Sequence, residues 1–263
     1  MRVFHICDLQ CQVTGAMAKS KGVPENHEAV QFPKKQIGTL GEKSLHSALK
    51  DWYAQAGDRL EAEVDGFQID ILRQNLLIEI QTANFSSLRR KLNTLIEKHP
   101  LRLVYPIARE KWIVRLAADG VTQLGRRKSP KKGNLFHLFE ELVSIPDLIK
   151  HRYFSLEALI IQKEEVRCDD GTGSWRRKGL RIADHHLIEV ISSHIFTKPS
   201  DFHALIPQDL TEPFSTYELG RSINQPRGLA QKMAYCLRHM GVIEIVGKNG
   251  NSLLYGSSKT VNV

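Results

Sequence analysis

Three short segments of alternating polar and apolar residues, separated by two tight turn signals, constrain the fold of this chain most. Alternation with a period of two is typical of β-strands, and Asp-Gly is a strong hairpin signal. We therefore predict three adjacent antiparallel strands. The segments are RLEAEV (59–64), FQIDIL (67–72) and LLIEIQT (76–82), with Asp65-Gly66 and Gln74-Asn75 between them.

Helical patterns flank these strands on both sides. TLGEKSLHSALKDWYAQ (39–55) has apolar residues near helical spacing, and SSLRRKLNTLIEK (86–98) is amphipathic, with Pro100 just beyond its end. LRLVYPI (101–107) is then typical of a buried strand. The order of helix, three strands, helix and strand predicts an α/β (α+β) domain in which a sheet packs against helices.

The middle of the chain has a less regular pattern. KWIVRLAADGVTQLG (111–125) predicts a hairpin, NLFHLFEELVSI (134–145) predicts a helix, and SLEALIIQKEEVR (155–167) fits a strand or a helix. Glycines and charges in CDDGTGSWRRKG (168–179) indicate a loop. We expect Asp184 to cap a helix through HHLIEVISSHIF (185–196).

The C-terminal residues predict a separate module. STYELGRSI (215–223) is a short helix, RGLAQKMAYCLRHMG (227–241) is a longer amphipathic one, and VIEIVGKNGNSLLYG (242–256) is a hairpin. This order is that of a winged helix-turn-helix. We therefore predict an N-terminal arm at 1–36, a main domain at 37–183 and a winged helix-turn-helix domain at 184–263.

Two acids stand in the predicted second and third strands. With Gln74-Asn75 as a two-residue loop, Asp70 falls opposite Glu79, and alternation puts both acids and Gln81 on one face. The other face would carry Ile69, Ile71, Ile78 and Ile80. Like charges directly opposed destabilise a sheet, and Mg²⁺ or Mn²⁺ between the carboxylates would remove the repulsion. Alternatively, this face is exposed to solvent and the acids are ordinary polar residues.

The order of elements, with Asp70 on the second strand and Glu79-Ile80-Gln81 on the third, resembles the core of the PD-(D/E)xK nucleases over about residues 38–107. The resemblance implies a restriction-endonuclease-like fold with a mixed central sheet flanked by helices. It also implies a metal site formed by Asp70, Glu79 and the backbone carbonyl of Ile80. Glu42 would be the acid that some members carry on the first helix.

The chain departs from the family motif at two positions. Ile69 stands where the motif usually has Pro, which is a common change. Gln81 replaces the usual Lys, as in a minority of restriction enzymes with a Glu-x-Gln variant. Gln cannot titrate and so cannot act as a general base, but its carbonyl oxygen can orient a water molecule.

Basic residues outnumber acidic ones, with 37 Lys and Arg against 29 Asp and Glu and a net charge of +8. This excess favours nucleic acid as a partner first and an acidic membrane surface second. Trp175 beside Arg176 suits stacking on a base. The alternative is that the basic runs are solvated loops and that the helix-turn-helix binds protein. The predicted nucleic-acid contacts are Arg89, Arg126, Arg127, Lys128, Lys131, Lys132, Arg176, Arg177, Lys178, Arg227, Gln231 and Lys232.

These observations together predict a metal-dependent DNA endonuclease that hydrolyses phosphodiester bonds in double-stranded DNA, acting in DNA defence, restriction or repair. The alternatives are a catalytically inactive DNA-binding or regulatory protein on a nuclease scaffold and an RNA-cleaving effector. The sequence has no apolar run of about 18 residues and no apolar leader, so we expect a cytoplasmic protein without a membrane partner. Cleavage of both strands would favour a homodimer or a partner protein.

Overall fold

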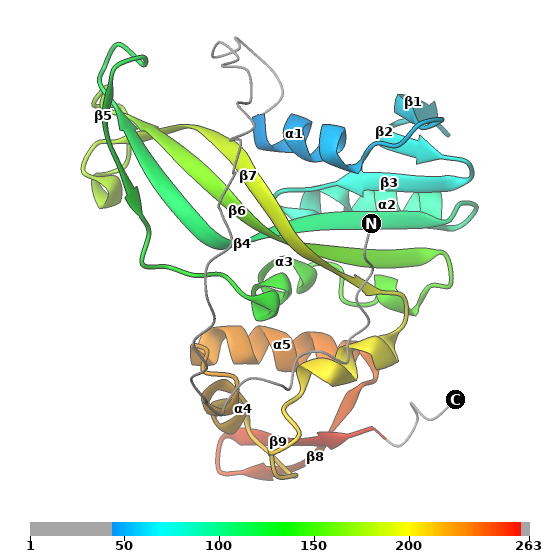
Figure 1. The fold of residues 1–263 in the computed structure, drawn as a ribbon. Helices are drawn as coiled ribbons and strands as arrows, with labels where there is room; N and C mark the ends of the chain where they lie inside the picture. Colours follow the sequence, from blue (N-terminus) through cyan, green and yellow to red (C-terminus); the bar gives the residue numbers. More distant parts are fainter. Residues whose placement is uncertain (1–43, 259–263) are drawn as a thin grey trace, which may run out of the picture. The chain divides into compact units, whose positions relative to one another are not determined.

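The computed structural model describes residues 44–258 (Figure 1). The arm predicted at residues 1–36 and the candidate acid Glu42 lie outside this range. Within residues 44–258, none of the helices is long and apolar enough to span a lipid bilayer.

The first half of the fold follows the predicted order of elements. Asp65 and Gly66 both have positive φ angles, 49° and 79°, which are those of a tight hairpin turn of type I′. β2 is antiparallel to both β1 and β3, and β4 runs parallel to β3 because α2 carries the chain back along the sheet. The elements are α1 (Ser44–Tyr53), β1 (Arg59–Val64), β2 (Phe67–Arg73), β3 (Leu76–Ile80), η2 (Phe85–Leu88), α2 (Arg89–Ile96) and β4 (Leu101–Leu116).

Long strands complete the sheet. β6 (Phe154–Cys168) lies parallel to β4, and β7 (Arg181–Phe196) is antiparallel to β6. β5 (Gln123–Lys128) pairs with the far end of β4, so the order is β1-β2-β3-β4-β6-β7 with β5 beside β4. The prediction of an α/β protein with a mixed central sheet flanked by helices is confirmed. The short elements are η3 (Leu135–Leu138), α3 (Phe139–Leu142), η4 (Leu148–Lys150) and η5 (Trp175–Arg177).

The helix predicted through residues 185–196 was wrong, because these residues lie in β7. The pairing with β6 shifts register three times, and two of the extra residues in β7 are Ile188 and Ile191. Each bulge inserts one residue and interrupts the alternation of the strand. The apolar residues therefore recur at a spacing that resembles a helix. β7 also continues across the domain boundary predicted between residues 183 and 184.

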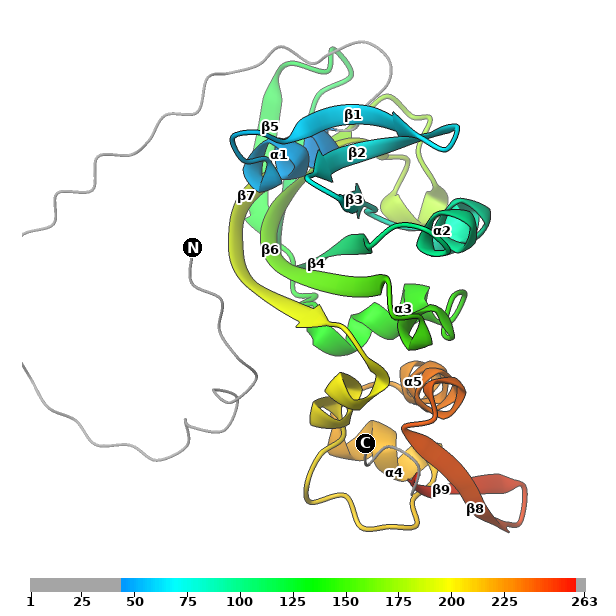
Figure 2. The ribbon, with the colours of Figure 1, turned by 90° about the vertical axis from the view of Figure 1, so that its right-hand side faces the viewer.

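Helices cover both faces of the sheet near β2 and β3. Viewed from the side, α1 and α2 lie on opposite faces of these strands (Figure 2). Ile71, Ile78 and Ile80 pack with the apolar residues of α1, whereas Leu77 packs with those of α2. Ile69, predicted to share the face of Ile71, packs on the α2 side instead. The alternation of β2 is thus broken around Asp70.

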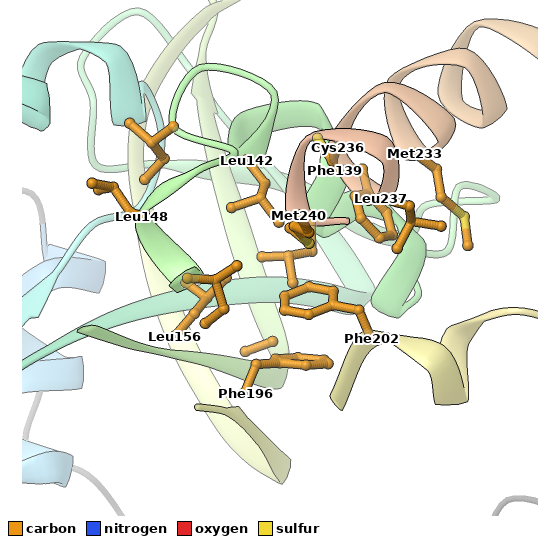
Figure 3. Packing of buried hydrophobic residues seen from close by; sticks show 14 of the residues in the cluster. Phe139, Leu142, Leu148, Leu156, Phe196, Phe202, Met233, Cys236, Leu237 and Met240 are labelled. Atoms are coloured by element: carbon orange, nitrogen blue, oxygen red, sulfur yellow. The ribbon is translucent and has the colours of Figure 1, made fainter. Parts of the chain in front are cut away.

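The C-terminal residues form two helices and a hairpin that share a core with the rest. In Figure 3, Leu237 and Met240 lie close to Phe139, Leu142 and Phe202, all in one buried apolar cluster. The two helices meet closely at Gly220, where an added Cβ would lie 3.1 Å from the Gln225 carbonyl oxygen. The elements are η6 (Pro199–Leu205), α4 (Thr216–Ser222), α5 (Arg227–Met240), β8 (Ile243–Asn249) and β9 (Ser252–Ser257).

Candidate functional site

The two acids lie where β2 and β3 separate. The ladder joins Leu72 to Leu77 and Ile71 to Ile78, which is the predicted register, and it ends there. Asp70 and Glu79 are the residues next to this last pair, one on each strand, and both side chains are buried. The register prediction is therefore confirmed, but the acids are not a paired position of the ladder.

Side-chain hydrogen bonds replace the ladder beyond this point. The Ile80 N–H donates to Asp70 Oδ2 at 2.8 Å, and the Asp70 N–H donates to the Glu79 carboxylate. Each carboxylate thus binds the backbone of the opposite strand. Since the N–H and C=O of one strand residue point to the same side, the Ile80 carbonyl also lies on the side of Asp70.

Each acid contacts side chains from a different helix. Because α1 and α2 cover opposite faces of the sheet, the prediction that Asp70 and Glu79 share one face was wrong. His46 Nε2 lies 3.1 Å from Asp70 Oδ2, and Lys50 Nζ lies 4.0 Å from Asp70 Oδ1; both residues are on α1. Lys91 of α2 donates to Glu79 Oε2 at 2.7 Å and also to the Gln68 carbonyl. These side chains relieve the repulsion for which the sequence argument required a metal ion.

Sequence reasoning missed His46, Lys50 and Lys91 as site residues. A signal existed for the first two, because residues four apart on a helix share a face and the first helix had to cover the sheet. Lys91 lies in the basic run 89–91, of which the sequence predicts only Arg89 as a nucleic-acid contact. Which of the three side chains turns toward the sheet depends on how α2 packs, and the run itself does not show this.

The environment shifts the pKa values of the two carboxyl groups in opposite directions. Burial alone would raise the pKa of Asp70, but the hydrogen bonds from His46 and the Ile80 N–H, together with nearby positive charge, hold that pKa below its usual value. Burial and the charge of Asp70 raise the pKa of Glu79, and Lys91 offsets this only in part. Asp70 is therefore the more firmly ionised of the pair.

Gln81 stands where the nuclease motif usually has Lys. Its side chain is turned toward the loop that follows β3. Its side-chain amide donates to the carbonyl oxygen of Ala83 and lies 3.5 Å from that of Asn84. Lys91, rather than Gln81, therefore supplies the nitrogen that contacts Glu79.

Among metal ions, a hard divalent cation is the kind that the oxygen atoms of this site would suit. Within residues 44–258, no three His, Cys, Asp or Glu side chains gather in an arrangement that could hold a metal ion. The oxygen ligands that this site offers are the two carboxylates and the Ile80 carbonyl. Mg²⁺ accepts such oxygen ligands and keeps several of its waters, and Mn²⁺ prefers the same donors. Zinc, which takes nitrogen and sulfur ligands in structural sites, is a poor match.

The predicted basic contacts on β5 differ in their surroundings. Arg126 Nε lies 2.7 Å from Glu164 Oε1, and its guanidinium lies over the Trp112 ring at 4.0 Å. Lys128 Nζ lies 2.7 Å from Glu110 Oε1. These two charges are partly neutralised within the chain. The exposed remainder of this stretch is Arg127, Lys131 and Lys132.

The structure brings the loop after β6 next to the turn after β4. The Asp169 N–H donates to the Leu116 carbonyl at 3.1 Å, and Arg115 forms an ion pair with Asp169. This loop exposes Arg176 and Lys178, while Arg177 is half-buried and donates to the Leu180 carbonyl. The loop that carries Arg176 and Lys178 therefore begins beside the turn that leads into β5.

The other predicted contacts occupy two separate helices. Arg89 is the exposed first residue of α2, two positions before Lys91. Arg227, Gln231 and Lys232 are exposed on α5. They lie on the opposite side of that helix from its buried residues, as expected for an amphipathic helix.

A family model described as "Domain of unknown function (DUF8091)" matches residues 43–197, more than half of the chain. The chain belongs to the DUF8091 family. The DUF8091 match includes every element from α1 to β7. It therefore includes both acids and the loops after β4 and β6, and it ends before α4.

One relative extends the similarity beyond the DUF8091 region. An "Uncharacterized protein" of Treponema pallidum (strain Nichols) is 33% identical over 223 residues, which cover 83% of this chain and 86% of that protein. No solved structure gives a significant match.

Proposed function

We propose that this protein is a metal-dependent endonuclease of the PD-(D/E)xK type that hydrolyses phosphodiester bonds in double-stranded DNA. The observation that carries the proposal is the pair of buried carboxylates on neighbouring strands, at the point where the ladder opens and the Ile80 carbonyl faces the same gap. Burying two acids so close together is costly, so a functional use accounts for them better than stability does. The order of elements around them adds support.

In this proposal the acid pair prepares the site for a cation and a phosphate. Asp70, Glu79 and the Ile80 carbonyl would hold Mg²⁺ or Mn²⁺, which when bound makes a water more acidic and offsets charge on the phosphate. Lys91 fixes the orientation of the Glu79 carboxylate and keeps a positive charge beside it. His46 orients Asp70 in the same way.

Exposed basic residues support a DNA substrate. Arg89 lies on the same helix as Lys91, and α5 presents Arg227, Gln231 and Lys232 to solvent. α4, α5 and the β8–β9 hairpin would act as a winged helix-turn-helix, with α5 as the recognition helix. Two such chains, or one chain and a partner protein, would cut both strands. Action in DNA defence, restriction or repair in the cytoplasm is consistent with this activity.

A second candidate is a catalytically inactive DNA-binding protein that keeps the nuclease scaffold. The orientation of Gln81 favours it, because this side chain bonds to its own loop and offers no group to an attacking water. Under this reading Lys91, Lys50 and His46 would permanently compensate the acids.

Cleavage of supercoiled plasmid with Mg²⁺ or Mn²⁺ tests the proposal. We would compare the wild type with Asp70→Asn and Glu79→Gln, since both amides can still accept the backbone hydrogen bonds of the site. Glu63→Gln, at an exposed position of β1, is the matched control. Nicking by the wild type and the control alone would support the endonuclease. Salt-dependent DNA binding by all four proteins without cleavage would support the second candidate, and cleavage of RNA alone would contradict a DNA substrate.

A further inference from the structure

The ends of the long strands form a structure that the proposed active site does not use. β4 and β6 continue past the acid pair, and their last residues connect to two loops, residues 117–122 and 169–180, which we call the sheet tip. Besides the Asp169 contacts described above, Cys168 Sγ lies 3.1 Å from the Ala117 carbonyl oxygen. In Figure 1 both loops lie at the same end of the sheet. The two loops therefore begin next to each other.

Apolar side chains at the sheet tip are unusually exposed. Trp175 is 83% exposed, Val121 is 79% exposed, and Leu124, just after the first loop, is 54% exposed. Single exposed apolar residues are common, but an almost fully exposed Trp beside the exposed cations Arg176 and Lys178 suits an interaction site. A Trp side chain buries a large area on binding and loses little conformational freedom, so it is an effective anchor.

The charges on and near the two loops are mostly positive. Within the part of the chain that the structure describes, Arg127, Arg176 and Lys178 form no ion pair, and all three are exposed. The nearby acids are already engaged: Asp169 with Arg115, Asp170 with Arg181, Glu164 with Arg126, and Asp119 with the backbone of its own turn. The sheet tip therefore presents an aromatic ring among uncompensated cations.

We propose that the sheet tip binds unpaired nucleotides, with Trp175 stacked on a base and Arg176 and Lys178 near the phosphates. A partner for this surface must carry negative charge and offer a flat apolar face. Nucleic acid has both, but a base within a duplex has its faces covered by its neighbours, so only single-stranded, melted or end-frayed segments expose them. Arg176 lies over the Trp175 ring at 5.7 Å, which places a cation directly beside the stacking position.

This inference extends the proposed function by naming the form of nucleic acid that is bound, and it does not require cleavage. Binding is therefore measured in EDTA, by fluorescence anisotropy of a labelled single strand of about 20 nucleotides, longer than a typical single-strand site. Trp175→Ala should weaken binding about tenfold, since one base stacked on an aromatic side chain contributes roughly that factor or more. Trp175→Phe should retain most of the affinity.

Trp52 provides the matched control. It is 47% exposed on α1, away from the sheet tip, so Trp52→Ala should bind as the wild type does. Intrinsic fluorescence should be quenched by the single strand in the wild type and in Trp52→Phe but much less in Trp175→Phe. This readout reports on the ring itself and does not depend on a stability change.

Equal affinity of the wild type and Trp175→Ala for the single strand would overturn the inference, as would tighter binding of a blunt duplex than of the single strand. Trp175-dependent binding to vesicles of phosphatidylcholine and phosphatidylglycerol, without binding to DNA, would overturn it in favour of a membrane surface. Loss of binding in Trp175→Ala together with no plasmid cleavage by any variant would support the sheet tip and reject the endonuclease. The two proposals can therefore fail separately.

Discussion

Lys91 connects the charge of the acid pair to the stability of the fold. Its ammonium contacts Glu79 and the Gln68 carbonyl, and both charged side chains of the pair are largely removed from solvent. Lys91→Met keeps the apolar stem and removes the charge, so a buried carboxylate loses its partner. We expect the free energy of unfolding at neutral pH to fall by about 3 kcal/mol, measured by urea denaturation.

Arg90→Met is the matched control, because Arg90 is the exposed neighbour on the same helix. It should change stability by no more than about 0.5 kcal/mol. Adding Glu79→Gln to Lys91→Met should recover part of the loss, since the uncompensated charge is then gone. Equal effects of the two Met variants would show that the Lys91–Glu79 contact contributes little.

His185 makes stability depend on pH. It lies opposite Glu165 in the β6–β7 ladder, and its Nδ1 is buried without a hydrogen-bond partner. Burial lowers the pKa of His185 to about 4, below the value of about 6.5 in an unfolded chain. Between these values the unfolded chain takes up a proton that the folded protein does not, so stability falls as the pH falls from about 6.5 to about 4.

Urea unfolding of the wild type and His185→Gln at a series of pH values tests this. The wild type should lose stability between neutral pH and pH 5, and the variant should lose less. Below that range the stability of both proteins should decline because of Glu165. Burial would raise the pKa of Glu165, but hydrogen bonds from Lys111 and Arg167 lower it to about 2. Its stabilising charge is therefore lost as the pH falls from about 4.5 toward 2. Parallel curves above pH 5 would contradict the role of His185.

At the level of the elements, the packing of α4 against α5 depends on one close approach, at Gly220. An added Cβ at Gly220 would lie 3.3 Å from Ala230 Cβ as well as near the Gln225 carbonyl, so a larger side chain must separate the helices. Gly220→Leu should lower the free energy of unfolding by about 2 kcal/mol, measured by thermal or urea denaturation.

Gly228 is the contrasting position, because an added Cβ there meets no atom within 4 Å and Gly228 lies in α5. Gly228→Ala should stabilise the protein by up to about 1 kcal/mol. Destabilisation by Gly228→Ala equal to that of Gly220→Leu would show that the helices respond to any added volume, and not to the contact at Gly220.

Local signals in the sequence predicted some elements and contacts and could not predict others. Asp65-Gly66 and the two-residue loop at Gln74-Asn75 fix the first hairpins, so the strands and the register beside the acids followed from neighbouring residues. β7 was assigned wrongly because its bulges at Ile188 and Ile191 arise from pairing with β6, which is a long-range interaction. The contact between Lys91 and Glu79 depends on helix packing, and no short pattern encodes it.

For the whole molecule, the excess of positive charge gives a measurable salt dependence. Arg127 is exposed without an ion pair among the described residues, whereas Lys128 next to it is paired with Glu110. We expect Arg127→Ala to reduce the slope of log affinity for DNA against log salt concentration by about one. Lys128→Ala should reduce it by less, because part of its charge is already neutralised. A larger effect of Lys128→Ala would contradict this assignment.

The length of β4 sets a distance scale for any polymer that this protein binds. Leu103 of β4 pairs with Glu79, and Leu116 of the same strand contacts the sheet tip. At about 3.3 Å per residue, the path between them along the strand is roughly 40 Å. Duplex DNA rises about 3.4 Å per base pair, so a segment that follows this path has about 12 base pairs. A shorter oligonucleotide would occupy one end of the strand and leave the other empty.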